Sequence, residues 1–143
     1  MTSIPHETSF GAFKPVGHVL MSFLNEAAAD SAVLQLQAAG FAADTLVRYT
    51  PQQMVAQADE DLRSATLMAA IGQELNLVKA QRVLAVQGQF FVLVPADTDD
   101  TLAQVTAVAQ ATGATRAQRY GQLIIEELVP AIFPLEPAKT EAT

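Results

Sequence analysis

Two Arg-Tyr pairs are the residues of this 143-residue chain best suited to binding chemistry. Arg48 precedes Tyr49 and Arg119 precedes Tyr120, and these are both tyrosines of the chain. A guanidinium group binds carboxylates and phosphates through paired hydrogen bonds, so each pair is a candidate anion-binding site. The alternative is structural: an Arg stem covers apolar surface at a strand edge while its head pairs with a nearby glutamate.

His18 and Lys79 are the other candidate ligand-binding residues. His18 opens an apolar segment, and a histidine at the mouth of a pocket titrates near neutral pH. Equally, it can be a strand-end histidine bonded to backbone. Lys79 lies with Arg82 in the stretch G-Q-E-L-N-L-V-K-A-Q-R. The two cations either add positive charge to a pocket or form the solvated edge of a helix.

Other chemistries lack the residues they need. Without Cys, the chain has no disulfide, iron–sulfur cluster or thiol nucleophile, and its seven Gly are not spaced as a phosphate-binding loop. Glu60 and Glu74 leave a carboxylate metal site as the weakest hypothesis, because neither has the His three residues on that di-iron bundles use. We therefore predict no metal and no cofactor, and assign no catalytic residue.

Composition limits the class of protein. Half of the residues are hydrophobic and 16% are charged, where about a quarter charged is usual. The net charge of −7 argues against non-specific nucleic-acid binding, which depends on Lys and Arg. No apolar run approaches the ~20 residues of a membrane helix, and the N-terminus does not have the pattern of a secretory signal. We expect a cytoplasmic protein with neither nucleic-acid nor membrane partners.

An internal repeat predicts the architecture. With Gly40 set against Gly113, HVLMSFLNEAAADSAVLQLQAAG aligns with FFVLVPADTDDTLAQVTAVAQATG. Each copy indicates an apolar strand, a helix capped by Asn25 or Thr98 and a terminating Gly, followed by a second strand. Two strand–helix–strand units predict an α+β fold of the ferredoxin-like split βαβ class, with an antiparallel sheet.

The strands of this fold are predicted at residues 19–24, 45–49, 90–94 and 122–129. Residues 19–21 of the first strand and 90–94 of the third are apolar on both faces, which is typical of central strands covered on both sides. The second and fourth contain charged residues, which suit exposed edges. Glu126 and Glu127 place a carboxylate on each face of the fourth strand.

A helical insertion at residues 51–87, between the second and third strands, distinguishes the chain from the plain fold. We predict helices at 51–64 and 67–87, the first starting at Thr50-Pro51 and carrying an Asp59–Arg63 ion pair on a solvated acidic face. The second helix has Gly72 in its middle. It is apolar around most of its circumference, so we expect it to lie between two surfaces.

The central strands need cover on both faces, and either the insertion or a second copy can supply it. We predict a homodimer formed through the open sheet face, the inserted helices or both. The domain is predicted at residues 16–129, preceded by a tail at 1–15. A Pro-containing arm follows at 130–143, whose Ile132, Phe133 and Leu135 can pack against the body or a second subunit.

Parts of the sequence resemble known proteins. The strand–helix–AAGF–strand pattern of residues 18–49 is similar to small bacterial general-stress-protein domains. The blocks Y-T-P-Q-Q-M, G-Q-E-L-N-L-V-K-A and R-Y-G-Q-L-I-I-E-E-L resemble proteobacterial proteins of about this length. The resemblance covers residues 16–129 and implies a stress-associated protein without assigned catalysis, so it transfers no catalytic residue.

Two functions follow from these patterns. The leading hypothesis is a non-enzymatic dimeric module that binds a small ligand or a protein partner. The alternative is an enzyme of the dimeric ferredoxin-like barrel type acting on a small anionic substrate. In that enzyme His18, Tyr49 or Tyr120 is the acid–base group and Arg48 or Arg119 holds the anion.

Overall fold

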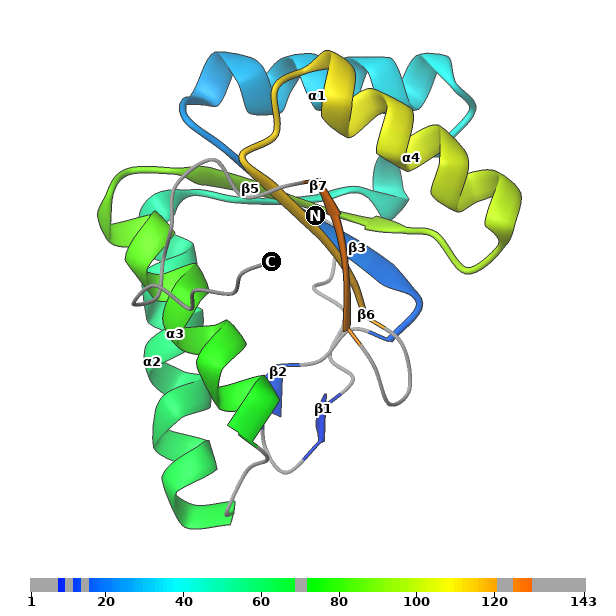
Figure 1. Ribbon diagram of the computed structural model, residues 1–143. Coiled ribbons are helices and arrows are strands. Elements are labelled where there is room, and N and C mark those ends of the chain that lie inside the picture. Colours follow the sequence, from blue (N-terminus) through cyan, green and yellow to red (C-terminus); the bar gives the residue numbers. More distant parts are fainter. Residues whose placement is uncertain (1–7, 10–11, 14–15, 69–71, 121–124, 130–143) are drawn as a thin grey trace, which may run out of the picture.

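Two strand–helix–strand units form the body of the protein in the computed structural model, which describes residues 8–9, 12–13, 16–68, 72–120 and 125–129 (Figure 1). The first unit consists of β3 (His18–Phe23), α1 (Glu26–Ala38), a 3-10 turn η1 (Ala43–Thr45) and β4 (Val47–Tyr49). The second consists of β5 (Phe90–Pro95), α4 (Asp99–Ala111) and β6 (Arg116–Tyr120). The predicted order of strand, helix and strand is therefore present in both halves, although the second strand of the second half is at Arg116–Tyr120 and not at 122–129.

Three further parts are added to this repeat. The insertion between the two units forms α2 (Pro51–Met68) and α3 (Gly72–Val86). A last strand, β7 (Ile125–Val129), follows the second unit. Within the segment predicted as a tail, β1 (Thr8–Ser9) and β2 (Ala12–Phe13) pair as a small antiparallel sheet.

The main sheet has five antiparallel strands in the order β4-β5-β3-β6-β7. The two apolar strands β5 and β3 are central, as predicted, and β4 is an edge. The predicted strand at 122–129 corresponds to β7 and does not lie beside β3, because β6 is placed between them. The prediction that strand 122–129 is the fourth strand of the repeat, with no strand between it and β3, was therefore wrong.

Strand β6 was not predicted, because its sequence, R-A-Q-R-Y, is mostly polar. These polar residues are compatible with an interior strand because β7 supplies matching carboxylates. Arg119 lies opposite Glu126 and Gln118 lies opposite Glu127, with a register shift between Ala117 and Gln118. Opposite charges across a strand pair stabilise the sheet, so the charges of β7, which is an outer edge as predicted, also join it to β6.

Capping residues set the starts of the helices as predicted. The Asn25 side chain accepts a hydrogen bond from the Ala28 N–H at the start of α1. Thr98 forms a capping box with Thr101 at the start of α4. Both helices are followed by a glycine with positive φ, Gly40 at 107° and Gly113 at 74°, a conformation that side-chain-bearing residues rarely adopt.

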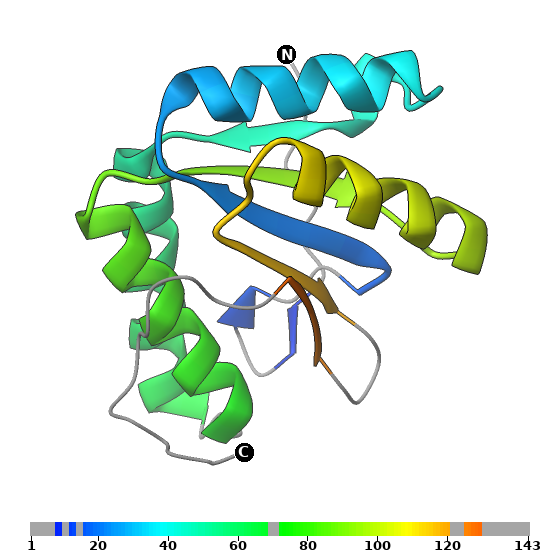
Figure 2. The ribbon, with the colours of Figure 1, turned by 45° about the horizontal axis from the view of Figure 1, so that its top comes forward.

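The face of the sheet under α1 and α4 carries the larger core. Figure 2 shows these two helices on one side of the sheet and the insertion on the other. Alternate residues of the central strands, such as Val19 and Val92, meet Leu36 of α1 and Val105 of α4 in this core. This is the arrangement expected when a two-sided strand presents successive side chains to opposite layers.

The insertion packs on the second face. Met54 of α2 and Leu84 of α3 share a buried cluster with Leu20, Tyr49 and Leu93 of the sheet. Of the two ways in which this face could be covered, the structure therefore shows the first, cover by the insertion of the same chain. The apolar residues on the sheet-facing side of the insertion are largely buried, because they pack against this face of the sheet.

The boundaries inside the insertion differ from the prediction. Helix α2 runs through Ser64–Thr66, where a break was predicted, and ends at Met68. Ser, Ala and Thr are tolerated inside a helix, whereas Gly is about 1 kcal/mol less favourable than Ala. Gly72 accordingly stands at the first position of α3, not in the middle of a helix. The side chains of residues 64–75 lie outside the described part of the structure.

Ion pairs on the insertion also differ from those predicted. Arg63 pairs with Glu60 one turn away, whereas Asp59 accepts a 2.6 Å hydrogen bond from Arg82 of α3. The acidic stretch is not wholly solvated, because Asp61 is buried and accepts a 3.0 Å hydrogen bond from Gln57. The Asp59–Arg82 pair links the two inserted helices.

The predicted arm at 130–143 and the Glu74 side chain lie outside the described residues. Across the part of the chain that is described, no helix is both long and apolar enough to cross a membrane. The same residues contain no group of three or more His, Cys, Asp or Glu positioned to hold a metal ion.

Candidate functional site

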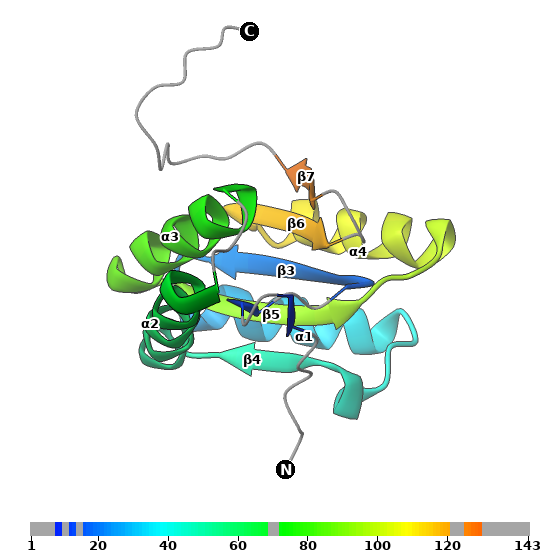
Figure 3. The ribbon, with the colours of Figure 1, turned by 90° about the horizontal axis from the view of Figure 1, so that it is seen from below.

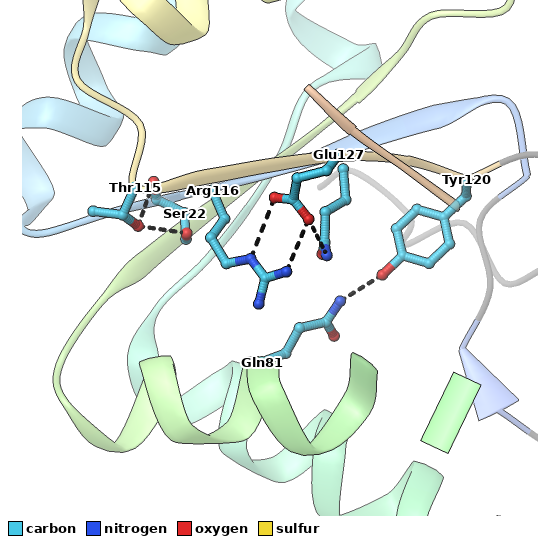
Figure 4. Close-up of polar contacts among 7 residues, drawn as sticks. Ser22, Gln81, Thr115, Arg116, Tyr120 and Glu127 are labelled. Carbon is cyan, nitrogen blue, oxygen red and sulfur yellow. Dashed lines mark hydrogen bonds and ion pairs between the residues drawn. The ribbon is translucent and has the colours of Figure 1, made fainter. Parts of the chain in front are cut away.

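A polar seam, formed by Gln81, Tyr120, Arg116, Gln118 and Glu127, lies between α3 and the end of the sheet formed by β6 and β7 (Figure 4). Gln81 projects from α3 and its Nε2 donates a 2.5 Å hydrogen bond to the Tyr120 hydroxyl. Both side chains are buried, Gln81 to 5% exposure and Tyr120 to 2%. Tyr120, predicted as a ligand-binding residue, therefore holds the insertion against the sheet.

Arg116 occupies the middle of the polar seam. Its Nη2 donates a 2.8 Å hydrogen bond to Glu127 Oε1, and its Nε lies 3.4 Å from Oε2 of the same carboxylate. The amide of Gln118 donates a 3.1 Å hydrogen bond to that same Oε1. The charge of Arg116 is thus matched within the fold by the strand that pairs with β6.

A buried chain of hydroxyl and amide groups adjoins the seam at the start of β6. The Ser22 and Thr115 hydroxyl oxygens are 2.7 Å apart, and Thr115 donates a 2.6 Å hydrogen bond to Gln89 Oε1. These three side chains are buried. The chain connects β3, the residue preceding β6 and the loop after α3, so it fixes where the insertion returns to the sheet.

The space enclosed by the seam is small. A cavity of about 10 Å³ is lined by residues of β3, β5, β6 and α3, among them Ser22, Gln81, Arg116 and Gln118. That volume is at the lower limit for a single water molecule. The polar seam is therefore a structural contact between insertion and sheet, and it has no room for a ligand.

A larger opening, here called the end pocket, lies where β4 and β5 meet the starts of α1 and α2. Its volume is about 250 Å³, and it is lined by Glu26, Ala29, Arg48, Tyr49, Thr50, Phe90 and Phe91. Two of the predicted ligand-binding residues, Arg48 and Tyr49, are thus brought together here. Ligand pockets commonly measure about 300–1,000 Å³, so the end pocket suits a molecule smaller than a typical drug.

Arg48 is the cation of the end pocket, and acidic residues of α1 surround it. It forms an ion pair with Asp30, and its Nη2 lies 3.8 Å from Glu26 Oε2. The Glu26 carboxylate is beyond hydrogen-bonding distance of Arg48, and its side chain is 65% exposed. Two carboxylates therefore face one guanidinium, and Glu26 is the less firmly engaged of the two.

The tyrosines are held in their neutral form. Burial raises the pKa of the Tyr49 phenol well above its ordinary range, and the Asp61 carboxylate adds to the effect. Burial also raises the pKa of Tyr120 far above its ordinary range, despite the opposing hydrogen bond from Gln81. A phenol with so high a pKa is a poor proton donor or acceptor at neutral pH.

The remaining predicted residues lie apart from the end pocket. Arg119 pairs with Glu126 at 3.1 Å on the α1/α4 side of the sheet. His18 is at the start of β3, with its Nδ1 3.2 Å from the Val16 carbonyl oxygen. Lys79 is exposed on α3. The structure therefore divides the six predicted residues among five places.

Sequence reasoning missed Glu26, Phe90 and Phe91 as members of a pocket. Glu26 was assigned as a first-turn acid, which it also is, and the Phe residues as core. Their convergence depends on the ends of β3, β4 and β5 lying side by side, which no local pattern indicates. The only available signal was that Arg48 precedes a helix start at Thr50-Pro51.

The described fold is that of an α+β protein with a five-stranded antiparallel sheet and an inserted helical pair. Comparisons of the chain with protein-family models, with curated proteins and with solved structures found no match. The resemblance to general-stress-protein domains therefore stays a prediction. The functional argument is built on the geometry of the end pocket.

Proposed function

We propose that this protein is a non-enzymatic module that binds a small organic cation with an apolar body in the end pocket. The observation that carries the proposal is that one opening of about 250 Å³ is lined by Glu26, Phe90 and Phe91, of which Phe90 is partly exposed. A positively charged amine meets Glu26, and the apolar part of the ligand lies against Phe90.

Charge favours a cation over the anion expected from the sequence. An anion bound by Arg48 has to approach both Asp30 and Glu26, and both carboxylates repel it. The helix starts give less compensation than open ones, because one first-turn N–H of each already has a side-chain partner. Asn25 binds the Ala28 N–H of α1, and Thr50 binds the Gln53 N–H of α2.

The apolar wall supplies binding energy and a second preference for cations. Phe90 is partly buried against the core, whereas Phe91 is almost fully buried. Contact between an apolar ligand and the exposed part of Phe90 removes apolar surface from water, at about 25 cal/mol per Å². The face of an aromatic ring also attracts a nearby cation.

The enzymatic alternative has less support from the geometry. Its acid–base group is His18, Tyr49 or Tyr120. His18 lies apart from the end pocket, and both tyrosines are buried with raised pKa values. It also requires Arg48 or Arg119 as an anion clamp, and both are engaged by carboxylates of the fold. A binding role requires neither a titrating tyrosine nor an arginine freed from its carboxylate partner.

The finer fold assignment is part of this proposal. We infer that β3-α1-β4 and β5-α4-β6 are the two halves of a ferredoxin-like split βαβ fold, with the helical pair inserted between them and β7 added at the edge. The order β4-β5-β3-β6 and its antiparallel pairing support this assignment. In such a fold the end pocket lies between the first helix and the insertion.

Nuclear magnetic resonance titration with three probes of similar shape tests the function. Phenethylamine, phenylethanol and phenylpropionate share an aromatic body and carry a positive, a neutral and a negative group. We expect phenethylamine to bind most tightly and to shift the amide signals of Arg48 and Phe90. Glu26→Gln should weaken its binding by about tenfold, the loss of one hydrogen bond to a charged group.

Glu60→Gln is the matched control, because it removes an exposed helix carboxylate on α2 away from the end pocket. It should leave phenethylamine affinity unchanged. Tighter binding of phenylpropionate in the same place would restore the anionic ligand predicted from the sequence and reject the cation. Absence of shifts with all three probes would reject the end pocket as a site for an aromatic ligand of this size.

A further inference from the structure

One face of α1 carries two carboxylates beside the end pocket. Glu26 and Asp30 are four residues apart, so their side chains lie one helical turn from each other on the same face. Like charges at this spacing repel and destabilise a helix. Arg48 of β4 lies against both, because it forms an ion pair with Asp30 and its Nη2 is 3.8 Å from Glu26 Oε2. The guanidinium group therefore offsets the repulsion between the two carboxylates.

Arg48 engages the two carboxylates to different degrees. The Oδ1 atom of Asp30, which is the atom paired with Arg48, is withdrawn from water, and Coulombic attraction is stronger away from bulk solvent. Glu26 is 65% exposed, lines the end pocket and is beyond hydrogen-bonding distance of Arg48. Figure 3 shows the arrangement that allows this, with α1 behind the edge of the sheet formed by β4 and β5. Arg48 is thus held by Asp30, and the carboxylate left for a ligand is that of Glu26.

We propose that the Asp30–Arg48 ion pair sets the charge of the ligand, so that the end pocket selects a molecule with one positive charge. This inference rests on the proposed function. Glu26, Asp30 and Arg48 together carry one net negative charge, which a monocation neutralises. A second ammonium group on the ligand meets the guanidinium of Arg48, which repels it. A neutral ligand leaves the charge of Glu26 unmatched.

Removal of the negative member of the pair should weaken the binding of a monocation. Asp30→Asn keeps the size of the side chain but removes its charge, so Arg48 is freed to pair with Glu26. The three groups then carry no net charge, and the ligand competes with Arg48 for the Glu26 carboxylate. Phenethylamine should bind about tenfold more weakly to this variant, the loss of one hydrogen bond to a charged group. Asp30 acts here through Arg48 and is a positioning residue.

Removal of the positive member should shift the preference toward a dication. Arg48→Gln leaves the two carboxylates of α1 without their guanidinium partner, and two ammonium groups can then neutralise them. The probe is m-xylylenediamine, which carries two ammonium groups on one aromatic ring. Its affinity relative to that of phenethylamine should rise about tenfold in Arg48→Gln compared with the natural protein, because a repulsive charge is replaced by an unmatched attractive one.

Isothermal titration calorimetry at neutral pH measures both affinities in the natural full-length protein, in these two variants and in three controls. Asp30→Glu and Arg48→Lys keep the charges while changing the shape of the ion pair, so both should retain the preference for phenethylamine. Asp99→Asn removes an exposed first-turn acid of α4 that does not line the end pocket, and it should change neither affinity. The charge-conserving variants distinguish a lost charge from a disturbed fold.

The outcomes separate this inference from the proposed function. If the natural protein binds phenethylamine, unchanged affinity in Asp30→Asn or an unchanged preference in Arg48→Gln would overturn the role of the ion pair and leave the proposed function standing. Loss of the preference in Asp30→Glu and Arg48→Lys would also overturn it, because shape and not charge would then matter. A natural protein that binds neither probe would reject the proposed function and this inference with it.

Discussion

The amide of Gln81 donates a hydrogen bond to the hydroxyl of Tyr120 across 39 positions of sequence, and it thereby joins the insertion to the interior strand β6. Both groups are almost fully withdrawn from water. A buried amide or phenol without a partner loses the hydrogen bonds it makes in the unfolded chain. The contact therefore selects the one placement of α3 in which both groups are satisfied.

Tyr120→Phe should lower the free energy of unfolding by about 1–3 kcal/mol, because it leaves the Gln81 amide buried and without its hydroxyl partner. Urea denaturation measures the change. Gln81→Leu combined with Tyr120→Phe removes both polar partners and should cost less than the sum of the two single changes. Strict additivity would mean that the hydrogen bond does not couple the insertion to the sheet.

Thr115→Val should destabilise the protein by a similar amount, about 1–3 kcal/mol. The substitution keeps the shape of the side chain but removes the hydroxyl that connects Ser22 to Gln89. Thr106→Val is the matched control. That hydroxyl bonds only to the Leu102 carbonyl within α4, so its loss should change the urea midpoint little. Equal effects would contradict the role given to the buried chain.

Met54→Ala should cost about 2–5 kcal/mol, the range for truncating a fully buried side chain. Met54 has no exposed surface and lies in the cluster between α2 and the sheet. Circular dichroism on heating should show a single transition at a lower temperature, since insertion and sheet share this core. Two separate transitions would show that the insertion unfolds independently. Gln52→Ala, exposed on the same helix turn, should have little effect.

Stability should fall as the pH rises above about 10. The folded pKa values of Tyr49 and Tyr120 are raised above their ordinary value, so the folded state holds these protons more tightly than the unfolded chain. The contribution is fully present below the unfolded pKa and is lost as pH climbs toward the folded pKa values. The loss is at most about 1.4 kcal/mol per pH unit for each tyrosine.

Ultraviolet absorbance of phenolate measures this transition without interference, because the chain has only these two tyrosines and no Trp. We expect phenolate to appear together with loss of the circular dichroism signal. Phenolate that forms near pH 10 in the still-folded protein would show that the two hydroxyls are open to water.

Local patterns were sufficient for the repeat and for the helix starts. The helix starts depend on Asn25, Thr98 and the Thr50-Pro51 pair. These residues act on backbone groups within one helical turn, so a short stretch of sequence is enough to predict their effect. Gly40 and Gly113 likewise act through their own backbone angles. The break between the inserted helices was predicted at the wrong place. Ser64–Thr66 can end a helix or continue one, and no capping residue or proline there ends it.

The sequence by itself determined that two strand–helix–strand units form around two apolar strands, because periodicity and capping are local. Tertiary structure decided what the polar residues do. The R-A-Q-R-Y segment becomes an interior strand only because β7 brings Glu126 and Glu127 beside it, and Arg48 meets Asp30 only when β4 lies beside α1. Whether a charge faces solvent, a partner or a ligand depends on residues distant in the chain, and long-range contact is what a linear pattern does not encode.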